Sequence, residues 1–215
     1  GAMMQPFTAH RSLKERQRQE REELILKAAE EVFMEKGYYE TSIDEIATRV
    51  GIAKGTVYLH FPSKEDLVVA IFQRDMECLL QLIKTTIASS MTPRAKAEMI
   101  LEQLYGSLFT RRMQLFYSIS NFAELKQNII QKKACVRDLW AEISADMTSL
   151  LEEGKAAGEF DSSIPTAVML STFFSFMSPR SYSHLLDEEH IPASELARHL
   201  ARIYFKGIVS IPQRA

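Results

Sequence analysis

Apolar residues recur along most of this chain at intervals of three and four positions, the spacing that places them on one face of an α-helix. No window alternates apolar and polar residues for long enough to predict a β-sheet. Glycines and prolines stand mostly between the periodic stretches, where helices begin and end. The pattern therefore predicts an all-α fold.

The periodic stretches and their capping residues predict the boundaries of individual helices. The first predicted helix turns Leu24, Ala28, Val32 and Phe33 toward a core, and Gly37 follows it as a C-terminal cap. The predicted helices span residues 13–36, 41–50, 53–61, 64–89, 93–109, 113–126, 128–157, 165–186 and 193–209.

Composition narrows the class of protein. Hydrophobic residues make up 46% and charged residues 25% of the 215 positions, which excludes wholesale disorder. The longest apolar run, 67–72, is far shorter than the roughly 20 residues that span a bilayer. No charged-then-apolar segment stands at the start, so we expect a cytoplasmic protein. Cys78 and Cys135 are expected to be reduced, buried and inert, with a redox-sensing role as the open alternative.

Charge is unevenly distributed over the first 64 residues. Residues 1–21 carry a net charge of +3, residues 22–45 carry −6, and residues 46–64 carry +3. Chance can produce such a pattern in a small sample. The alternative is that the two basic segments face a polyanion while the acidic segment faces solvent or the rest of the protein. The motif within the second basic segment helps to distinguish these interpretations.

Two short helices separated by a glycine are predicted between residues 41 and 61. The first, 41–50, ends at Gly51, and Ile52 can enter the core beneath the turn. The second, 53–61, is ended by Pro62. This arrangement is typical of the helix-turn-helix unit, whose second helix enters the major groove of DNA. The apolar face of the first helix consists of Ile43, Ile46, Ala47 and Val50.

The second helix has an inward and an outward face when it is drawn at 100° per residue. With Val57 pointing inward, Phe61 and Ala53 are expected to pack beside it. Leu59 falls on the opposite side, and we hypothesise that it contacts a thymine methyl group. The outward residues are Gly55, Thr56, Tyr58 and Leu59, flanked by Lys54 and His60.

Each outward residue type suits a contact with DNA. Gly55 removes a side chain where the backbone approaches DNA closely, and Thr56 and Tyr58 offer hydroxyls to phosphates or base edges. Lys54 can reach a guanine acceptor or a phosphate. Lys64, which follows the helix cap at Ser63, combines its own charge with the free N–H groups of a helix start, an arrangement that favours a phosphate.

The stretch from Thr41 to Leu67, TSIDEIATRVGIAKGTVYLHFPSKEDL, resembles the DNA-binding signature of the TetR/AcrR family of transcriptional regulators. Upstream, residues 28–33 with Gly37 and Tyr38 match the same pattern, so the resemblance covers about residues 20–72. One position departs from it. Ala53 stands where the family often has Ser or a similar capping residue, which removes an N-cap hydroxyl worth about 1 kcal/mol.

The resemblance implies a homodimer whose two helix-turn-helix units bind a palindromic operator in double-stranded DNA. It implies an N-terminal three-helix DNA-binding domain, 11–66, a connecting helix at about 64–89, and a helical effector-binding and dimerisation domain, 67–215. Repression relieved by a small ligand is the usual arrangement in such proteins. The positions that match DNA-contacting positions of the family are Thr41, Lys54, Gly55, Thr56, Tyr58, His60 and Lys64, with Ser42 as a weaker match.

The basic segment from Arg11 to Arg21 has two interpretations. It is either a solvated helix face or an arm that follows phosphates or the minor groove. Each phosphate contact would add about 0.9 to the slope of log affinity against log salt concentration.

Met and aromatic residues are frequent in the second part of the chain. They are either core residues or the lining of an adaptable pocket for a bulky lipophilic effector. No motif there identifies the effector. The candidate effector-binding residues are Tyr105, Phe109, Phe116, Tyr117, Asn121, Trp140, Met147, Phe173 and Met177.

The last predicted helix carries a narrow apolar seam with small residues beside it. The family resemblance implies that the last two helices form a four-helix bundle between two subunits, with 167–177 as the partner segment. The alternative is that both helices pack within one subunit. The seam consists of Leu196, Leu200, Ile203 and Gly207, with Ala197 and Ala201 beside it.

No constellation of catalytic residues is evident, so we expect no enzyme, no cofactor and no metal site. The five histidines lack metal-ligand spacing, and neither a glycine-rich phosphate loop nor a nucleophile elbow occurs. The sequence favours a ligand-responsive repressor. An activator or a regulator without a ligand stays open, as does a helical carrier of hydrophobic molecules with a vestigial DNA-binding domain.

Overall fold

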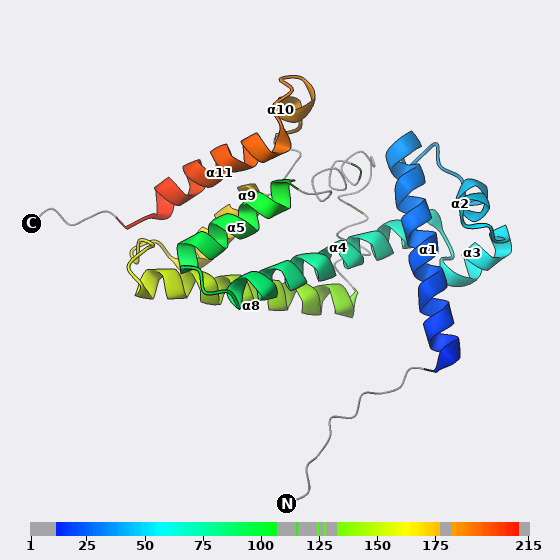
Figure 1. The fold of residues 1–215 in the computed structure, drawn as a ribbon, viewed down its shortest axis with the longest axis horizontal. Coiled ribbons are helices and arrows are strands. Elements are labelled where there is room, and N and C mark those ends of the chain that lie inside the picture. The colour runs from blue at the N-terminus through cyan, green and yellow to red at the C-terminus, as the bar shows by residue number, and fades with distance from the viewer. Residues whose placement is uncertain are drawn as a thin grey trace, which may run out of the picture. The chain divides into compact units, whose positions relative to one another are not determined.

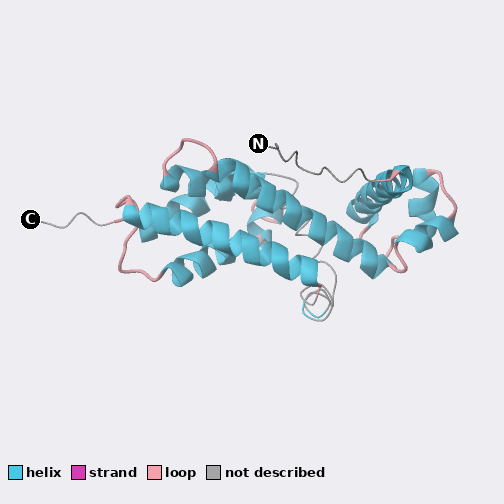
Figure 2. Cartoon of the chain, turned by 90° about the horizontal axis from the view of Figure 1, so that it is seen from below, coloured by secondary structure: helices cyan, strands magenta, loops and turns pink. Residues whose placement is uncertain are grey.

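A computed structural model describes residues 12–106, 133–176 and 182–210, together with residues 115, 124 and 127. The described chain is helical almost throughout, which confirms the predicted all-α fold (Figures 1 and 2). Apart from one isolated antiparallel bridge, between Phe160 and Val209, no β-structure occurs among these residues. The helices are α1 (Leu13–Lys36), α2 (Ile43–Val50), α3 (Lys54–His60), α4 (Lys64–Ile87), α5 (Pro93–Gly106), α8 (Ala134–Ala156), α9 (Thr166–Phe176), α10 (Ser183–Asp187) and α11 (Ala193–Ile208).

The chain divides into two compact units, residues 1–70 and residues 71–215. The first unit contains α1, α2, α3 and the first turns of α4. Its core forms because each helix turns one apolar stripe inward, where burial removes that surface from water. The fully or almost fully buried side chains of this core include Ile25, Ala29, Val32, Phe33, Ile46, Val57 and Leu67.

Side-chain caps define where the helices of the first unit begin. Ser12 and Glu15 form a capping box at the start of α1, in which each side chain accepts a hydrogen bond from the backbone N–H of the other residue. Ser42 caps α2 by accepting from the N–H of Glu45 at 3.2 Å.

The second unit is built around α5, α8, α9 and α11, which contact one another in pairs. The Tyr204 hydroxyl in α11 donates to the carbonyl of Met169 in α9 at 2.7 Å, and this hydrogen bond is buried. Gly154 lies under the ring of Phe160, where an added Cβ would come within 2.2 Å of a ring carbon. The C-terminal end of α8 therefore needs glycine at this position for close packing.

Two predicted helix boundaries in the second unit are wrong. The helix expected at 128–157 begins at Ala134, where Lys133 is its N-cap residue. The helix expected at 165–186 is two elements, α9 and α10, because Tyr182 has the non-helical backbone angles of an N-cap. Pro179 lies in the sequence between them, and a proline in a helix interior costs about 3 kcal/mol. Most of the helix expected at 113–126 lies outside the described residues.

Several burial predictions also need correction. Leu24 is 58% exposed, and Ile25 takes its place in the core because the buried stripe of α1 passes through position 25. Ala53 is exposed because it is the N-cap of α3 and lies outside the helical turn that packs. Cys78 and Cys135 are both exposed, so neither is a core thiol, and the Cys135 thiol donates to Gln73 at 3.3 Å.

The apolar seam of the last helix divides between two environments. Leu196 and Leu200 are buried within their own subunit, where α11 packs on α5 and α9. Ile203, at 62% exposure, and Gly207 are left on the surface. The first half of the seam therefore belongs to the core of the second unit, and only its second half is open to another partner.

None of the helices in the described part of the chain is both long enough and apolar enough to cross a membrane.

Candidate nucleic-acid interface

The turn between α2 and α3 is a tight left-handed cap. Gly51 has φ 80° and ψ 33°, angles that favour glycine, and its N–H donates to the carbonyl of Ala47 at 2.9 Å. The N–H of Ile52 donates to the same carbonyl at 3.0 Å. This geometry is the glycine turn that the sequence predicts, and it fixes the direction in which α3 leaves α2.

The orientation of α3 agrees with the helical wheel for its central residues. Val57 is fully buried, whereas Tyr58 is 43% exposed and Leu59 is 81% exposed. Gly55 is exposed, and a Cβ built on it meets no atom within 4 Å. The protein's own packing therefore does not require glycine at position 55, which leaves close approach of a partner as a physical reason for it.

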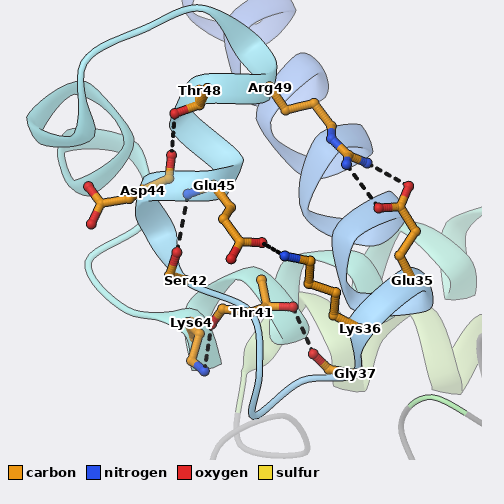
Figure 3. A network of polar contacts seen from close by, with 10 residues as sticks. All are labelled: Glu35, Lys36, Gly37, Thr41, Ser42, Asp44, Glu45, Thr48, Arg49 and Lys64. Atoms are coloured by element: carbon orange, nitrogen blue, oxygen red, sulfur yellow. Dashed lines mark hydrogen bonds and ion pairs between the residues drawn. The ribbon is translucent and has the colours of Figure 1, made fainter.

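A network of ion pairs holds α2 against α1 (Figure 3). The Arg49 guanidinium donates to both carboxylate oxygens of Glu35, at 2.8 and 2.9 Å, and Lys36 lies 3.0 Å from Glu45. The hydrogen bond from Arg49 lowers the pKa of Glu35. Part of the acidic segment is thus paired with nearby cations, and Arg49 faces the acidic residues of α1.

Thr41 and Lys64 direct their side chains into the unit. The Thr41 side chain is buried and donates to the carbonyl of Gly37 at 2.7 Å. The Lys64 ammonium donates to the carbonyls of Tyr38 at 2.9 Å and Thr41 at 3.0 Å, and lies 4.6 Å from the centre of the Tyr38 ring. Lys64 therefore ties the start of α4 to the connection between α1 and α2, a contact that sequence reasoning missed.

Lys54 stays at the surface. Its ammonium lies 3.0 Å from Asp44 of α2, and this hydrogen bond raises the pKa of Lys54. Both side chains are about half exposed or more, so water screens the pair and either partner can exchange it for another.

His60 lies against α1 and has little exposed surface. Its Nδ1 is 3.1 Å from an Oε1 of Glu22, and the same oxygen accepts from Arg18 Nε at 3.1 Å. Partial burial alone would raise the pKa of Glu22, but the hydrogen bonds from His60 and Arg18 lower it overall. His60 thus joins α3 to α1 instead of projecting from the outer face.

Seven of the nine predicted DNA-contacting residues line one of two hollows beside α3. An open groove of about 530 Å³ is lined by Thr41, Ser42, Lys54, Tyr58 and Lys64. Leu59 and His60 instead line a second hollow, on the side of α3 that faces α1. Gly55 and Thr56 are not among the lining residues described for either hollow.

The candidate effector-binding residues lie in several places. Tyr105, Met147 and Phe173 are buried in α5, α8 and α9 of the second unit, and burial raises the pKa of Tyr105. Trp140 is 46% exposed, and its ring centre lies 4.8 Å from that of Phe174. The remaining candidates lie outside the described residues: Phe109, Phe116, Tyr117, Asn121 and Met177.

Within the described ranges, no group of three or more His, Cys, Asp and Glu side chains could hold a metal ion.

A left-handed glycine turn between two short helices, with the outer side chains of the second helix exposed, defines the class of helix-turn-helix proteins. Residues 25–71 match the family described as "Bacterial regulatory proteins, tetR family". By this match, and by its similarity to regulators of the same kind, the chain resembles the TetR family of transcriptional regulators.

Three relatives in sequence are regulators of different kinds. The fatty acid metabolism regulator protein of Bacillus subtilis is 22% identical over 184 residues, which cover 86% of this chain and 93% of that protein. The transcriptional activator FasR of Mycolicibacterium smegmatis is 40% identical over 85 residues, 38% of this chain and 39% of FasR. The negative regulator IcaR of Staphylococcus aureus is 28% identical over 138 residues, 61% of this chain and 69% of IcaR.

Two solved structures share the fold. A TetR/AcrR-family regulator from Thermobifida fusca matches with a TM-score of 0.69 and 28% identity, over 87% of this chain and 98% of that one. FadR of Bacillus subtilis, in complex with stearoyl-CoA, matches with a TM-score of 0.61 and 19% identity, over 86% and 98%. The FadR match, at this identity, concerns the fold alone.

Proposed function

We propose that this protein is a homodimeric repressor that binds a palindromic operator through α3 and is released by a lipophilic effector. The observation that carries the proposal is the outer face of α3, where Leu59 and Tyr58 are exposed and Gly55 leaves open space. A helix that enters the major groove needs exposed side chains to contact base edges and open backbone that can approach DNA, and this face of α3 has both.

The contacts with DNA divide by role. Lys54 and Tyr58 line the open groove beside α3, where an ammonium and a hydroxyl suit phosphates or base edges. Leu59 offers an apolar contact for a thymine methyl group. Thr41 and Lys64 act mainly as positioning residues, because their polar groups are engaged with backbone carbonyls of the same unit.

A lipophilic effector is favoured by the chemistry of the second unit and by its relatives. Tyr105, Met147 and Phe173 supply large apolar and aromatic surfaces to its interior. A relative in sequence regulates fatty acid metabolism, and a protein of the same fold binds stearoyl-CoA. An effector with a long acyl chain is therefore the first chemical class to test.

Selection of bound sequences from a random duplex pool by the purified protein tests the proposal. A palindrome with two half-sites is the expected result, because a symmetric dimer presents two copies of α3. Long-chain acyl-CoA added to the complex should then release the DNA. Absence of any enriched sequence, with or without acyl-CoA, contradicts the proposed function.

A transcriptional activator is the second candidate function. It is favoured by the similarity to the activator FasR, which is 40% identical to this chain over 85 residues. Transcription from a promoter carrying the selected operator separates the two, since a repressor lowers the transcript level and an activator raises it. A carrier with a vestigial DNA-binding domain is the third possibility. Retention of an acyl chain without salt-dependent binding to any duplex would favour the carrier.

A further inference from the structure

The first three turns of α1 form a helix without buried side chains. Every residue from Ser12 to Arg21 is exposed, although the capping box at Ser12 gives the helix a defined start. A helical segment of this length without tertiary packing is only marginally stable by itself. The segment therefore extends beyond the core of the first unit as a surface that is available to a partner.

The core-facing stripe of α1 changes character along the helix. From Ile25 onward the stripe is apolar and buried, with Ala28, Ala29 and Val32 at helical spacing. The same stripe continues toward the N-terminus as a set of cationic and amide side chains. Its four members, at i, i+3, i+4 and i+7, are Lys14, Gln17, Arg18 and Arg21.

These four side chains line a hollow of about 290 Å³ together with Leu59 and His60 of α3. The acidic residues Glu15 and Glu20 lie about 110° away from the centre of the stripe on the helical wheel. Glu22 accepts hydrogen bonds from Arg18 and His60, two of the residues that line the hollow, and is not itself among the lining residues. The hollow therefore presents a net positive surface beside the most exposed apolar side chain of α3.

We propose that this cationic groove, defined by Lys14, Gln17, Arg18, Arg21, Leu59 and His60, binds the sugar–phosphate backbone of the DNA that α3 reads. The inference rests on the proposed function and extends it. The cations follow a helical row, which suits successive phosphates, and Leu59 connects the row to the outer face of α3. Contacts of this kind position the protein on the duplex and carry no sequence information.

The test compares two double variants of the full-length chain with equal changes in charge. K14Q/R21Q removes two cations of the groove, and R16Q/K27Q removes two exposed cations from the other side of the same helix. All four positions are exposed, so both variants should keep the wild-type helix content by circular dichroism. Binding is measured by fluorescence anisotropy at several salt concentrations, on the selected operator and on a scrambled duplex.

The slope of log affinity against log salt should fall in magnitude by about 1.8 for each bound K14Q/R21Q subunit, because two phosphate contacts are lost. R16Q/K27Q should keep the wild-type slope. The ratio of operator to scrambled affinity should not change in K14Q/R21Q, because phosphate contacts do not read sequence.

Equal slopes for the two variants would overturn the assignment of the groove to DNA. Equal slopes together with a loss of inorganic phosphate binding in K14Q/R21Q would assign the groove to a free anion instead. A wild-type protein that binds no duplex would contradict the proposed function itself, which is a different and separately visible outcome.

Discussion

At the scale of single residues, Gly55 is a glycine that the fold does not require and that recognition of DNA can use. It lies in α3 with open space around its missing side chain, and its φ is not in the positive range that favours glycine. Its smallness therefore does not serve the packing of this unit. An exposed backbone on the outer face of α3 is instead suited to close contact with another molecule.

Gly55→Ala should leave the melting temperature unchanged or slightly raised, because alanine is the better helix former by up to about 1 kcal/mol. The same change should weaken operator binding, because the added methyl group stands where DNA approaches. Thermal unfolding and operator affinity, measured on the same preparation, check the two halves of the prediction. An unchanged affinity would show that DNA does not approach α3 at this position.

Lys64 and Lys54 look alike in the sequence and differ in the structure. Lys64 donates to two backbone carbonyls from a partly buried position, whereas Lys54 pairs with one exposed carboxylate. Lys64→Met should lower the free energy of unfolding by about 1–3 kcal/mol. Lys54→Met should cost no more than about 1 kcal/mol, since exposed ion pairs contribute little.

Urea unfolding of the two methionine variants measures this difference directly. Both changes remove one positive charge from the same unit, so a general effect of charge would appear equally in both. Losses of stability of the same size in the two variants would contradict the positioning role of Lys64.

At the scale of elements, the sequence predicts the helices of the first unit well because their signals are local. Capping residues, the glycine at 51 and the proline at 62 mark boundaries by short-range physics, and α1 and α2 end at the predicted residues. The exposure of Leu24 could not be predicted from such local signals, because Leu24 and its neighbour Ile25 both fit an apolar helical stripe. Only packing against other helices chooses between them.

The candidate interface shows the same limit. The exposure of Tyr58 and Leu59 follows from one helical wheel and was predictable. The hydrogen bonds from Lys64 to the connection after α1 join residues that are 23 and 26 positions apart in the sequence. The helical periodicity of the sequence does not predict contacts over such separations. The basic segment at the start of α1 is evident in the sequence, but the position of its cations beside Leu59 depends on tertiary structure.

The contact between α1 and α3 should give the first unit a specific response to acid. The pKa of Glu22 is lowered by its hydrogen bonds to His60 and Arg18, against the opposing effect of partial burial. A carboxylate whose pKa is lowered by folding stabilises the folded state at pH values above its ordinary pKa of 4.5. This stabilisation is lost as the pH falls through the lowered pKa of the folded state.

Glu22→Gln removes this titration while it keeps the shape of the side chain. The variant should be less stable than the wild type at neutral pH, and the difference should shrink as the pH falls below about 4.5. Thermal unfolding of both proteins between about pH 3 and pH 7 measures the difference directly. A difference that stays constant over this range would show that Glu22 contributes through something other than its charge.

At the scale of the whole molecule, recognition of a palindrome needs two copies of α3, and each chain supplies one. The proposed function therefore assigns an interface as well as an effector site to the second unit. Val168 of α9 and Ile203 of α11 are 53% and 62% exposed, although apolar residues of this size are usually buried. They are the first residues to test as parts of a homodimer interface.

Val168→Glu with Ile203→Glu should convert the dimer to a monomer, because burying unpaired carboxylates between subunits costs several kcal/mol. Helix content should not change, since both side chains are exposed in the single subunit. Leu24→Glu with Leu13→Glu is a matched control, because these leucines of α1 are 58% and 64% exposed. Sedimentation velocity should show a monomer for the first double variant and a dimer for the second.

The consequence for DNA follows from the symmetry. A monomer reaches only one half-site, so the first double variant should bind the full palindrome no more tightly than an isolated half-site, whereas the wild type gains from linking two binding events. A wild-type protein that sediments as a monomer, both free and on its operator, would remove the homodimer from the proposed function. A double variant that stays dimeric would instead place the interface on another face of the second unit.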